Sequence, residues 1–343
     1  MSATPTIDVH AHAIFPQLGA AVARLDPEGL AAHQALEALR NGPESLQASG
    51  AMVGARMEQL TVLSRRLSDM DRTGIDVQVV SPSPSHYYPF LAAEAAVEVA
   101  QLANTAVRDL VAEAPDRLVG LGLIALQHPH LAVALLEHAV LECGLRGVEI
   151  SSFAPDPAGG HPIDLSDERL EPFWARAVEL DAVVFLHPFG CSLDERLDRF
   201  YLSNTVGQPA ENAVALSQLI FSGVLDRHPD LVLIASHGGG YLPTYIGRSD
   251  HAWRARPEAK VPKNAPSTYL RMLYFDSLVH SAAGLAVLVD AVGADRVVLG
   301  SDYPFDMGTD DPLADLRGAG LDEATSDAIA GATALILRLG IES

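Results

Sequence analysis

The sequence predicts an α/β protein folded as a (β/α)8 TIM barrel. Eight short apolar segments with few internal charges recur along the 343 residues, as expected for parallel strands that are buried on both faces. Helical patterns separate them, for example over 91–114 and 211–227. This regular alternation is typical of a closed parallel barrel. The predicted strands are 6–10, 76–80, 117–124, 146–150, 182–187, 231–236, 272–276 and 296–302.

Two segments are longer than a plain barrel requires. Residues 13–58 separate the first strand from its predicted helix at 59–73, and we expect a small insertion there that is helical around 20–40. The segment 151–168, after the fourth strand, is rich in Pro, Gly and Asp, and long loops of this kind are often functional. No internal repeat or linker is visible, so we expect one domain over 1–343.

Composition excludes several classes of protein. A net charge of −21 argues against a nucleic-acid binder, and no apolar stretch is long enough to span a membrane. No signal-peptide pattern is present, and two cysteines do not make a disulfide framework, so we expect a cytoplasmic protein. Lys260 and Lys263 are the only lysines, so a barrel-strand Schiff base or metal-bridging carbamate has almost no candidate.

Polar side chains collect where predicted strands end. His10 and His12 end the first strand, His187 the fifth, His237 the sixth and Asp302 the eighth. In such barrels function lies at these carboxyl ends, and residues two apart on a strand point the same way. Imidazole and carboxylate ligands suit Zn²⁺, which lowers the pKa of a bound water toward neutrality. His237 need not bind the metal, because a histidine beside it can remove that proton.

Other histidines have a plainer interpretation. His128 and His130 flank a proline at a helix start and are expected to be surface or capping residues. His86 follows the second strand and could line the substrate mouth, while Asp276, which ends the seventh, could face the site or cap a loop. Four histidines in helical or loop segments are likewise expected to be surface or capping residues; they are His33, His138, His228 and His251.

Together these motifs resemble those of the amidohydrolase superfamily. The H-x-H pair, the His-Pro after the fifth strand, SHGGG after the sixth and GSDYPF after the eighth carry the likeness. More narrowly, the chain is similar to the aminocarboxymuconate-semialdehyde decarboxylase (ACMSD) group of metal-dependent decarboxylases. The likeness runs from residue 10 to about 335, and HGGGYLPTYIGRSDHAW (237–253) and GADRVVLGSDYPF (293–305) are its specific parts.

The resemblance implies a ligand set and a reaction. It implies one Zn²⁺ per chain, or another divalent metal such as Mn²⁺, held by His10, His12, His187 and Asp302. His237, together with Asp302, would then activate the metal-bound water, and the hydroxide would add to an unsaturated carbon before CO2 leaves. No oxygen and no organic cofactor would be needed.

The resemblance also suggests residues that bind substrate. Arg248 matches an arginine that reaches across a homodimer to the substrate carboxylate, although a surface salt bridge is the plain alternative. Arg56 lies near the position of a second carboxylate-binding arginine, with Arg65 and Arg66 as nearby alternatives. Phe189 stands in the substrate site where the family commonly has tryptophan. Together with His86, these arginines and Phe189 are the predicted substrate-binding residues.

We therefore expect a non-oxidative decarboxylase, a carbon–carbon lyase acting on an unsaturated or aromatic carboxylic acid from aromatic catabolism. An example is 2-amino-3-carboxymuconate 6-semialdehyde. Related hydroxybenzoate decarboxylases tend to begin E-x-H, so the H-x-H pair favours the muconate-semialdehyde side. A hydratase or hydrolase on the same scaffold stays open. So does a two-metal hydrolase that uses Glu149 as the bridging ligand, whereas an intact ligand set argues against a non-enzymatic protein.

Overall fold

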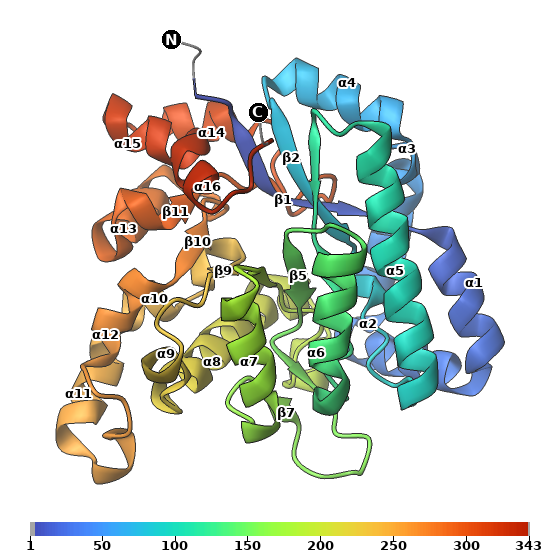
Figure 1. Ribbon diagram of the computed structural model, residues 1–343, viewed down its shortest axis with the longest axis horizontal. Helices are drawn as coiled ribbons and strands as arrows, with labels where there is room; N and C mark the ends of the chain where they lie inside the picture. Colours follow the sequence, from blue (N-terminus) through green and yellow to red (C-terminus); the bar gives the residue numbers. More distant parts are fainter. Residues whose placement is uncertain (1–3, 342–343) are drawn as a thin grey trace.

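The computed structural model describes residues 4–341 and is a (β/α)8 barrel, as predicted (Figure 1). Every predicted strand is present, and the strand predicted at 117–124 is divided into β3 and β4. The barrel strands are β1 (Ile7–Ala13), β2 (Val77–Pro82), β3 (Leu118–Gly120), β4 (Gly122–Leu123), β5 (Gly147–Ile150), β8 (Val183–Leu186), β9 (Leu233–Ala235), β10 (Tyr274–Asp276) and β11 (Val297–Val298).

The strands pair in parallel in the order β1-β2-β3 and then β4-β5-β8-β9-β10-β11. The Leu121 amide between β3 and β4 donates to Val80 O over 3.0 Å. The barrel is closed by contacts between β1 and the segment after β11, because the Val9 amide donates to Leu299 O over 2.8 Å and Ala11 forms a parallel bridge with Tyr303. The first and last strands are therefore neighbours.

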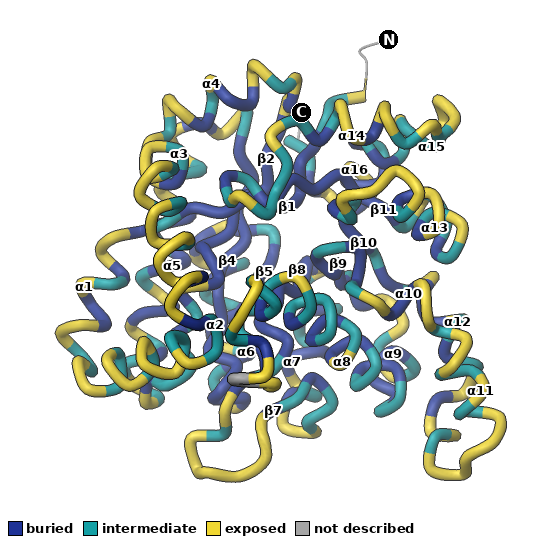
Figure 2. Tube along the Cα trace, turned by 180° about the vertical axis from the view of Figure 1, so that it is seen from behind, coloured by how far each residue is buried: buried dark blue, intermediate teal, exposed yellow. Residues whose placement is uncertain are grey.

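Alternate residues of the strands build two cores. Val183 and Phe185 belong to an interior cluster, whereas Val184 and Leu186 pack in the larger cluster beneath the helices. This period of two is expected for strands covered on both faces. The interior cluster also includes Leu337 and Leu339 near the end of the chain. In Figure 2 the dark blue strands lie inside the shell of partly yellow helices.

A bulge in β1 changes the direction of its side chains. Ile7 and Val9 belong to the interior cluster, so strict alternation would point His10 outward. Between Asp8 and Ala11, however, β1 contains one residue more than β2 does opposite it. Such bulges re-aim side chains. Accordingly, the His10 ring lies 5.0 Å from the Phe185 ring, inside the barrel.

Helices cover the barrel, and none that the structure describes is both long and apolar enough to cross a membrane. They are α1 (Pro16–Leu25), α2 (Pro27–Ala55), α3 (Met57–Thr61), α4 (Leu63–Thr73), α5 (Ala93–Glu113), α6 (Pro129–Glu137), α7 (Glu171–Glu179), α8 (Gln208–Phe221), α9 (Val224–Arg227), α10 (Leu242–Tyr245), α11 (Gly247–Ala255), α12 (Pro266–Tyr269), α13 (Ala282–Val292), α14 (Pro312–Gly318), α15 (Glu323–Asp327) and α16 (Thr333–Ile336).

The insertion at 13–58 is helical, as expected, and consists of α1 and α2. Gly42, with φ +72°, bends α2 ahead of Pro43. A Cβ at position 42 would lie 1.9 Å from Asp198 O, so only glycine fits this approach to the segment after β8. Asn41 and Ser203 extend the contact through a 2.7 Å hydrogen bond. The insertion therefore packs across the carboxyl end of the barrel.

The long segment 151–168 has structure of its own. It forms an antiparallel pair, β6 (Phe153–Ala154) and β7 (Ile163–Asp164). Ile163 and Leu165 are buried, and the tip between the two strands is largely exposed (Figure 2). This hairpin follows β5 and therefore stands on the same face as the predicted site.

Candidate metal centre

Five side chains converge at the carboxyl ends of the strands. His10 and His12 lie in β1, His187 follows β8, His237 follows β9 and Asp302 follows β11. Ligand atoms of His10, His187, His237 and Asp302 all lie within 4.8 Å of one another, the one such group of potential metal ligands within residues 4–341. His12 Nε2 is 3.1 Å from His10 Nε2 and 3.3 Å from Asp302 Oδ1. The structure thus brings all five predicted residues together.

The hydrogen bonds of these groups leave lone pairs directed at one point. His10 Nδ1 donates to Asp276 over 2.6 Å, and His187 Nδ1 donates to the Pro188 carbonyl over 2.8 Å. His187 Nε2 and Asp302 Oδ1 are buried and have no hydrogen-bond partner in the described chain. Buried polar atoms are rarely left so, because the lost hydration costs about 1–3 kcal/mol each. A divalent cation would satisfy them, so these residues fit a metal site.

The electrostatics of the site also favour a cation. Burial opposes charge on His10, but the Asp302 and Asp276 carboxylates outweigh it and raise the pKa of His10 to about 9. Burial would raise the pKa of Asp302, yet His10 and His12 hold it well below its usual range. A negative field therefore surrounds the point on which the imidazoles converge.

Asp276 orients His10 from behind. Its Oδ1 accepts the Gly238 and Leu278 amides over 2.8 and 3.2 Å, so its Oδ2 is held toward His10 Nδ1. Burial opposes ionisation, but the hydrogen bond from His10 lowers the pKa of Asp276. Of the two roles open to Asp276 from the sequence, the structure favours the one at the site. Such carboxylate–histidine pairs fix the ring nitrogen that faces the metal.

Glu149 orients His12 through a serine. Ser81 Oγ lies 3.1 Å from His12 Nδ1 and donates to Glu149 Oε2 over 2.5 Å. Glu149 Oε1 accepts a 2.7 Å hydrogen bond from the Tyr87 hydroxyl. Because both carboxylate oxygens already accept hydrogen bonds, this geometry favours an orienting role for Glu149 over the bridging role of a two-metal site.

Two residues of the centre have a left-handed backbone. His237 has φ +53° and Asp302 has φ +57°, a strained conformation for residues with a side chain. His237 is followed by three glycines, and a Cβ on Gly240 would lie 2.0 Å from Pro209 O. The SHGGG motif therefore permits a tight turn that carries the imidazole to the barrel mouth.

A cavity of about 290 Å³ opens over the centre, and we call it the metal cavity. His187 and Asp302 form its floor, and Phe189, Tyr201 and Phe305 contribute aromatic walls. The insertion forms a further wall through α2 residues Glu37, Arg40, Asn41, Leu46, Ser49, Met52 and Val53. Of the residues described along this lining, Arg40 is the one lysine or arginine. Sequence patterns did not reveal Arg40, because nothing in them shows that α2 folds over the mouth.

The predicted substrate residues take different places. Phe189 lines the metal cavity. Arg56 donates to Pro304 O over 2.7 Å and lies 3.4 Å from Asp310 Oδ1, on the loop after Asp302. His86 is buried beneath the mouth, where its Nε2 accepts the Phe15 amide over 3.1 Å. Neither Arg56 nor His86 is among the described residues that line the cavity, so their binding roles stay predictions.

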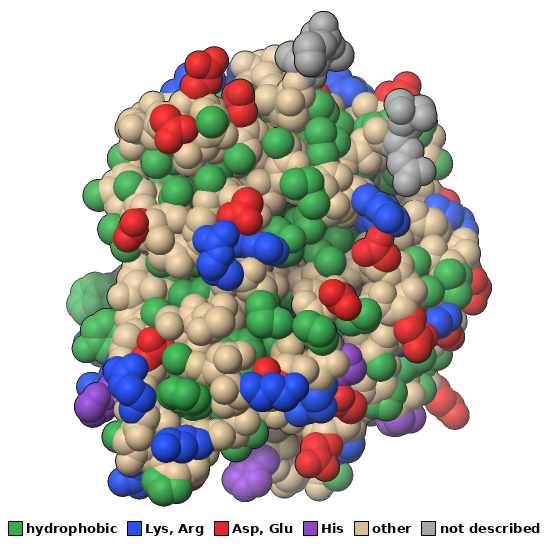
Figure 3. Space-filling view, turned by 60° about the vertical axis from the view of Figure 1, so that its left-hand side comes forward, with side chains coloured by type: hydrophobic (Ala, Val, Ile, Leu, Met, Phe, Trp, Pro, Cys, Tyr) green, Lys and Arg blue, Asp and Glu red, His purple; other side chains and the backbone are tan. Residues whose placement is uncertain are grey.

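Arg248, Arg65 and Arg66 are not among the described residues that line the cavity. Arg248 is exposed on α11, a helix without buried residues that extends from the body of the barrel (Figure 1). On the side turned forward in Figure 3, basic and acidic side chains are interspersed among apolar ones. Arg66, one of the two sequence alternatives to Arg56, is buried and donates to His12 O over 2.5 Å and Gln78 over 2.6 Å, and Arg65, the other, donates to Asp69 over 3.0 Å. It supports the backbone of the site.

Comparisons with known proteins agree with this geometry. The amidohydrolase family model matches residues 7–337. A 2-amino-3-carboxymuconate-6-semialdehyde decarboxylase of Dictyostelium discoideum is 35% identical over 71% of this chain and 67% of its own. A gamma-resorcylate decarboxylase of a Rhizobium strain is 29% identical over 77% of this chain and 85% of its own.

A solved structure has the same fold. It is a dihydroxybenzoic acid decarboxylase from a Polaromonas strain with bound manganese and an inhibitor, 2-nitroresorcinol. It superposes with a TM-score of 0.79 at 24% identity and covers 97% of this chain and 96% of its own. With the barrel, the ligand geometry and the match over 7–337 in agreement, this chain belongs to the amidohydrolase family, and its relatives there include metal-dependent decarboxylases.

Proposed function

We propose that this protein is a metal-dependent, non-oxidative decarboxylase of an unsaturated or aromatic carboxylic acid. The observation that carries the proposal is that His187 Nε2 and Asp302 Oδ1, on the floor of a cavity and beside His10 and His12, are buried and have no hydrogen-bond partner among the described residues. The names of the relatives support this reaction class. We retain 2-amino-3-carboxymuconate 6-semialdehyde as the first candidate substrate and place dihydroxybenzoates second.

His10, His12, His187 and Asp302 would hold one divalent ion. Three imidazoles and one carboxylate suit Zn²⁺, our first choice, and the manganese in the Polaromonas enzyme makes Mn²⁺ the second. When bound, the ion supplies Lewis acidity that holds an anionic substrate oxygen and lowers the pKa of a neighbouring water.

The side chains around the ion would transfer a proton to the substrate and bind its carboxylate group. Decarboxylation replaces a C–CO2⁻ bond by a C–H bond, so one proton must reach that carbon as CO2 leaves. His237 can hold this proton, because its side chain is 16% exposed and its Nε2 is 3.7 Å from Asp302 Oδ2. Arg40, the arginine in the lining of the metal cavity, can bind the carboxylate of the substrate. The aromatic side chains in the walls of the cavity would keep water away from the planar part of the substrate.

Product analysis tests the proposal against the hydratase and hydrolase alternatives. Protein loaded with zinc, and separately with manganese, is offered the muconate semialdehyde and 2,6-dihydroxybenzoate, and CO2 release is followed together with product mass. We expect CO2 release with a product lighter by one CO2 and a metal content near one per chain. Addition of water without CO2 would instead assign a hydratase, and two metals per chain would favour the site bridged by Glu149.

A further inference from the structure

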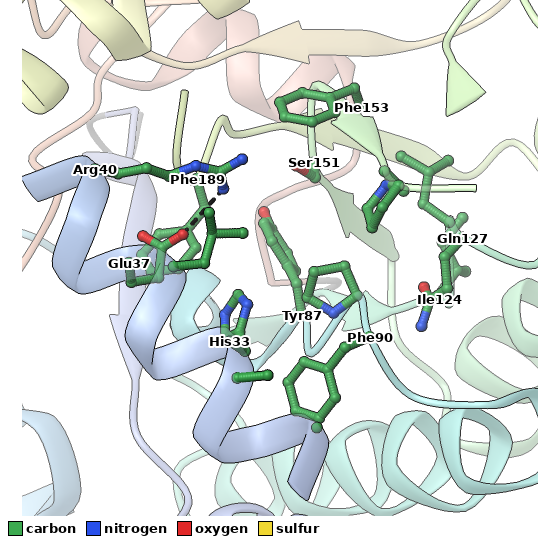
Figure 4. A pocket seen from close by; sticks show the side chains of 17 residues that line it. His33, Glu37, Arg40, Tyr87, Phe90, Ile124, Gln127, Ser151, Phe153 and Phe189 are labelled. Carbon is green, nitrogen blue, oxygen red and sulfur yellow. Dashed lines mark hydrogen bonds and ion pairs between the residues drawn. The ribbon is translucent and has the colours of Figure 1, made fainter. Parts of the chain in front are cut away.

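A second cavity, drawn in Figure 4, lies beside the metal cavity, because the two have lining residues in common. It also measures about 290 Å³, and we call it the side cavity. Its residues follow the strands: Tyr87 comes after β2, Ile124 after β4, Ser151 after β5 and Phe189 after β8. Helix α2 closes the opposite side through Ala32, His33, Leu36, Glu37 and Arg40. The side cavity therefore belongs to the face on which barrel enzymes bind substrates.

The two cavities share a wall. Glu37, Arg40 and Phe189 line both of them. Arg40 Nη1 donates to Glu37 over 3.1 Å, and the pair lies over Gly190, the residue after Phe189. The hydroxyl oxygen of Tyr87, which also lines the side cavity, lies 3.0 Å from His187 O. A ligand group in the side cavity would thus lie one side chain away from the metal centre.

The lining is suited to an apolar group. Phe90, Phe153, Tyr87 and Phe189 contribute four aromatic rings, with Phe90 and Phe153 on opposite sides of the cavity in Figure 4. The aliphatic residues Leu36, Ile124 and Leu126 and the Ala32 and Ala154 methyl groups cover most of the rest. Two of the polar residues in the lining have protein partners, since Gln127 donates to Tyr88 O over 3.3 Å and Arg40 donates to Glu37 over 3.1 Å, while the His33 ring lies 5.1 Å from the Phe90 ring. Pockets with this balance bind apolar ligand groups.

An acid with a single ring could bind in the metal cavity without occupying the side cavity. The metal cavity alone has about 290 Å³, close to the lower end of the roughly 300–1,000 Å³ of pockets that hold drug-sized ligands. We propose that the side cavity binds an alkyl substituent of the substrate, and that the natural substrate is an acid whose carboxyl-bearing unit reaches the metal while its apolar chain lies between Phe90 and Phe153. For the carboxyl-bearing unit of that substrate, this inference rests on the proposed function.

The first test compares substrates that differ only in the chain. Values of kcat/KM are measured for 2,6-dihydroxybenzoate and its 4-ethyl, 4-propyl and 4-butyl derivatives with metal-loaded protein. We expect kcat/KM to rise about fourfold for each buried methylene. Ala32→Trp, which narrows the side cavity, should abolish this rise, and Leu36→Ala, which removes part of its apolar wall, should make the rise for each methylene smaller. Ala35→Trp is the matched control, because Ala35 is exposed on the same helix and lines neither cavity.

A binding measurement separates this inference from the proposed function. Resorcinol and 5-butylresorcinol, the products that these acids would form, are titrated by calorimetry into the metal-loaded protein, which needs no turnover. Tighter binding of butylresorcinol that Ala32→Trp removes and Ala35→Trp keeps supports the side cavity even if no acid is decarboxylated. Decarboxylation without any chain-length dependence, or equal binding of both resorcinols, overturns the inference and leaves the proposed function standing.

Discussion

The Asp276 carboxylate accepts a hydrogen bond from His10 Nδ1 over 2.6 Å, and both side chains are fully buried. The two residues are 266 positions apart in the chain. Because Nδ1 is used in this way, His10 presents Nε2 to His12, to Asp302 and to the centre between them. The pair therefore determines which nitrogen of His10 can bind a metal.

Replacing Asp276 by Asn should weaken metal binding. The neutral amide no longer stabilises the donating imidazole, and loss of such a partner commonly costs 10–100-fold in metal affinity. Competition of the Asp276→Asn variant with a chromophoric chelator measures this directly. Asp290→Asn, an exposed aspartate on α13, is the control. An unchanged dissociation constant would show that Asp276 does not support the ligand.

His237 should be needed for the turnover rate but not for metal binding. If it moves the proton, His237→Ala keeps about one metal per chain and loses roughly 10²–10⁴-fold in kcat. His187→Ala should instead lose the metal, because its buried Nε2 is directed at the centre. Metal content by mass spectrometry and turnover are measured on the same samples. Loss of metal from His237→Ala would make His237 a ligand.

Arg40 should serve the acid group of the substrate. Arg40→Met should raise KM about tenfold or more with a smaller change in kcat, since a charge-assisted hydrogen bond to a carboxylate is lost. Arg40→Lys should recover part of this loss. Arg24→Met is the control, because Arg24 forms an exposed ion pair with Glu98 on the outer helices. Equal KM values for all three variants would remove Arg40 from substrate binding.

Arg248 should act across a homodimer. Arg248→Ala should weaken substrate use and keep the metal, because the residue is exposed and is not among the described residues that line the metal cavity. A mixture of inactive His237→Ala and Arg248→Ala chains should regain activity, since a hybrid dimer contains one site with both natural side chains. Sedimentation checks the dimer. Absence of recovery in a mixture that does form hybrid dimers would place Arg248 outside the partner's site.

His86 should make stability depend on pH. Burial lowers the pKa of His86 to about 4, while the unfolded chain has the ordinary value of 6.5. Between these values the unfolded chain binds a proton that the folded one does not, so the free energy of unfolding falls as pH drops, by roughly 2 kcal/mol at pH 5 relative to pH 7.5.

The variant His86→Phe isolates this contribution. At pH 7.5 the variant should be less stable, because the hydrogen bond to the Phe15 amide is lost. Between pH 7.5 and pH 5 its free energy of unfolding, measured with urea, should fall less than that of the unmodified protein. Its KM should be unchanged if the ring supports the loop instead of touching substrate. A KM effect with an unchanged pH dependence would favour the binding role predicted from the sequence.

Much of the fold could be predicted because its causes are local. Strands buried on both faces are continuous apolar runs, and all eight predicted runs are strands in the structure. The five polar groups at strand ends could be predicted for the same reason, since a barrel brings its strand ends together. The bulge between Asp8 and Ala11 could not, because it depends on the register against β2.

The remaining parts of the site depend on contacts far apart in the chain. No periodicity shows that Glu149 meets Ser81 or that α2 packs over the loop after β8. His86 follows a strand end as His237 does, yet its ring nitrogens bond to Phe15 and Tyr88. Position at a strand end thus indicates nearness to the site, whereas the direction of the side chain depends on the neighbours.

The seam between the first and last strands affects the order in which the molecule can be assembled. His10 and Asp302 belong to opposite ends of the chain, and the amides of Val9 and His12 donate to Leu299 and Tyr303 over 2.8 Å each. Synthesis runs from the N-terminus, so the free edge of β1 has no partner until the ribosome has released the final strand. The predicted ligands His10, His12, His187 and Asp302 therefore come together only after β11 and the segment that follows it have closed the barrel against β1.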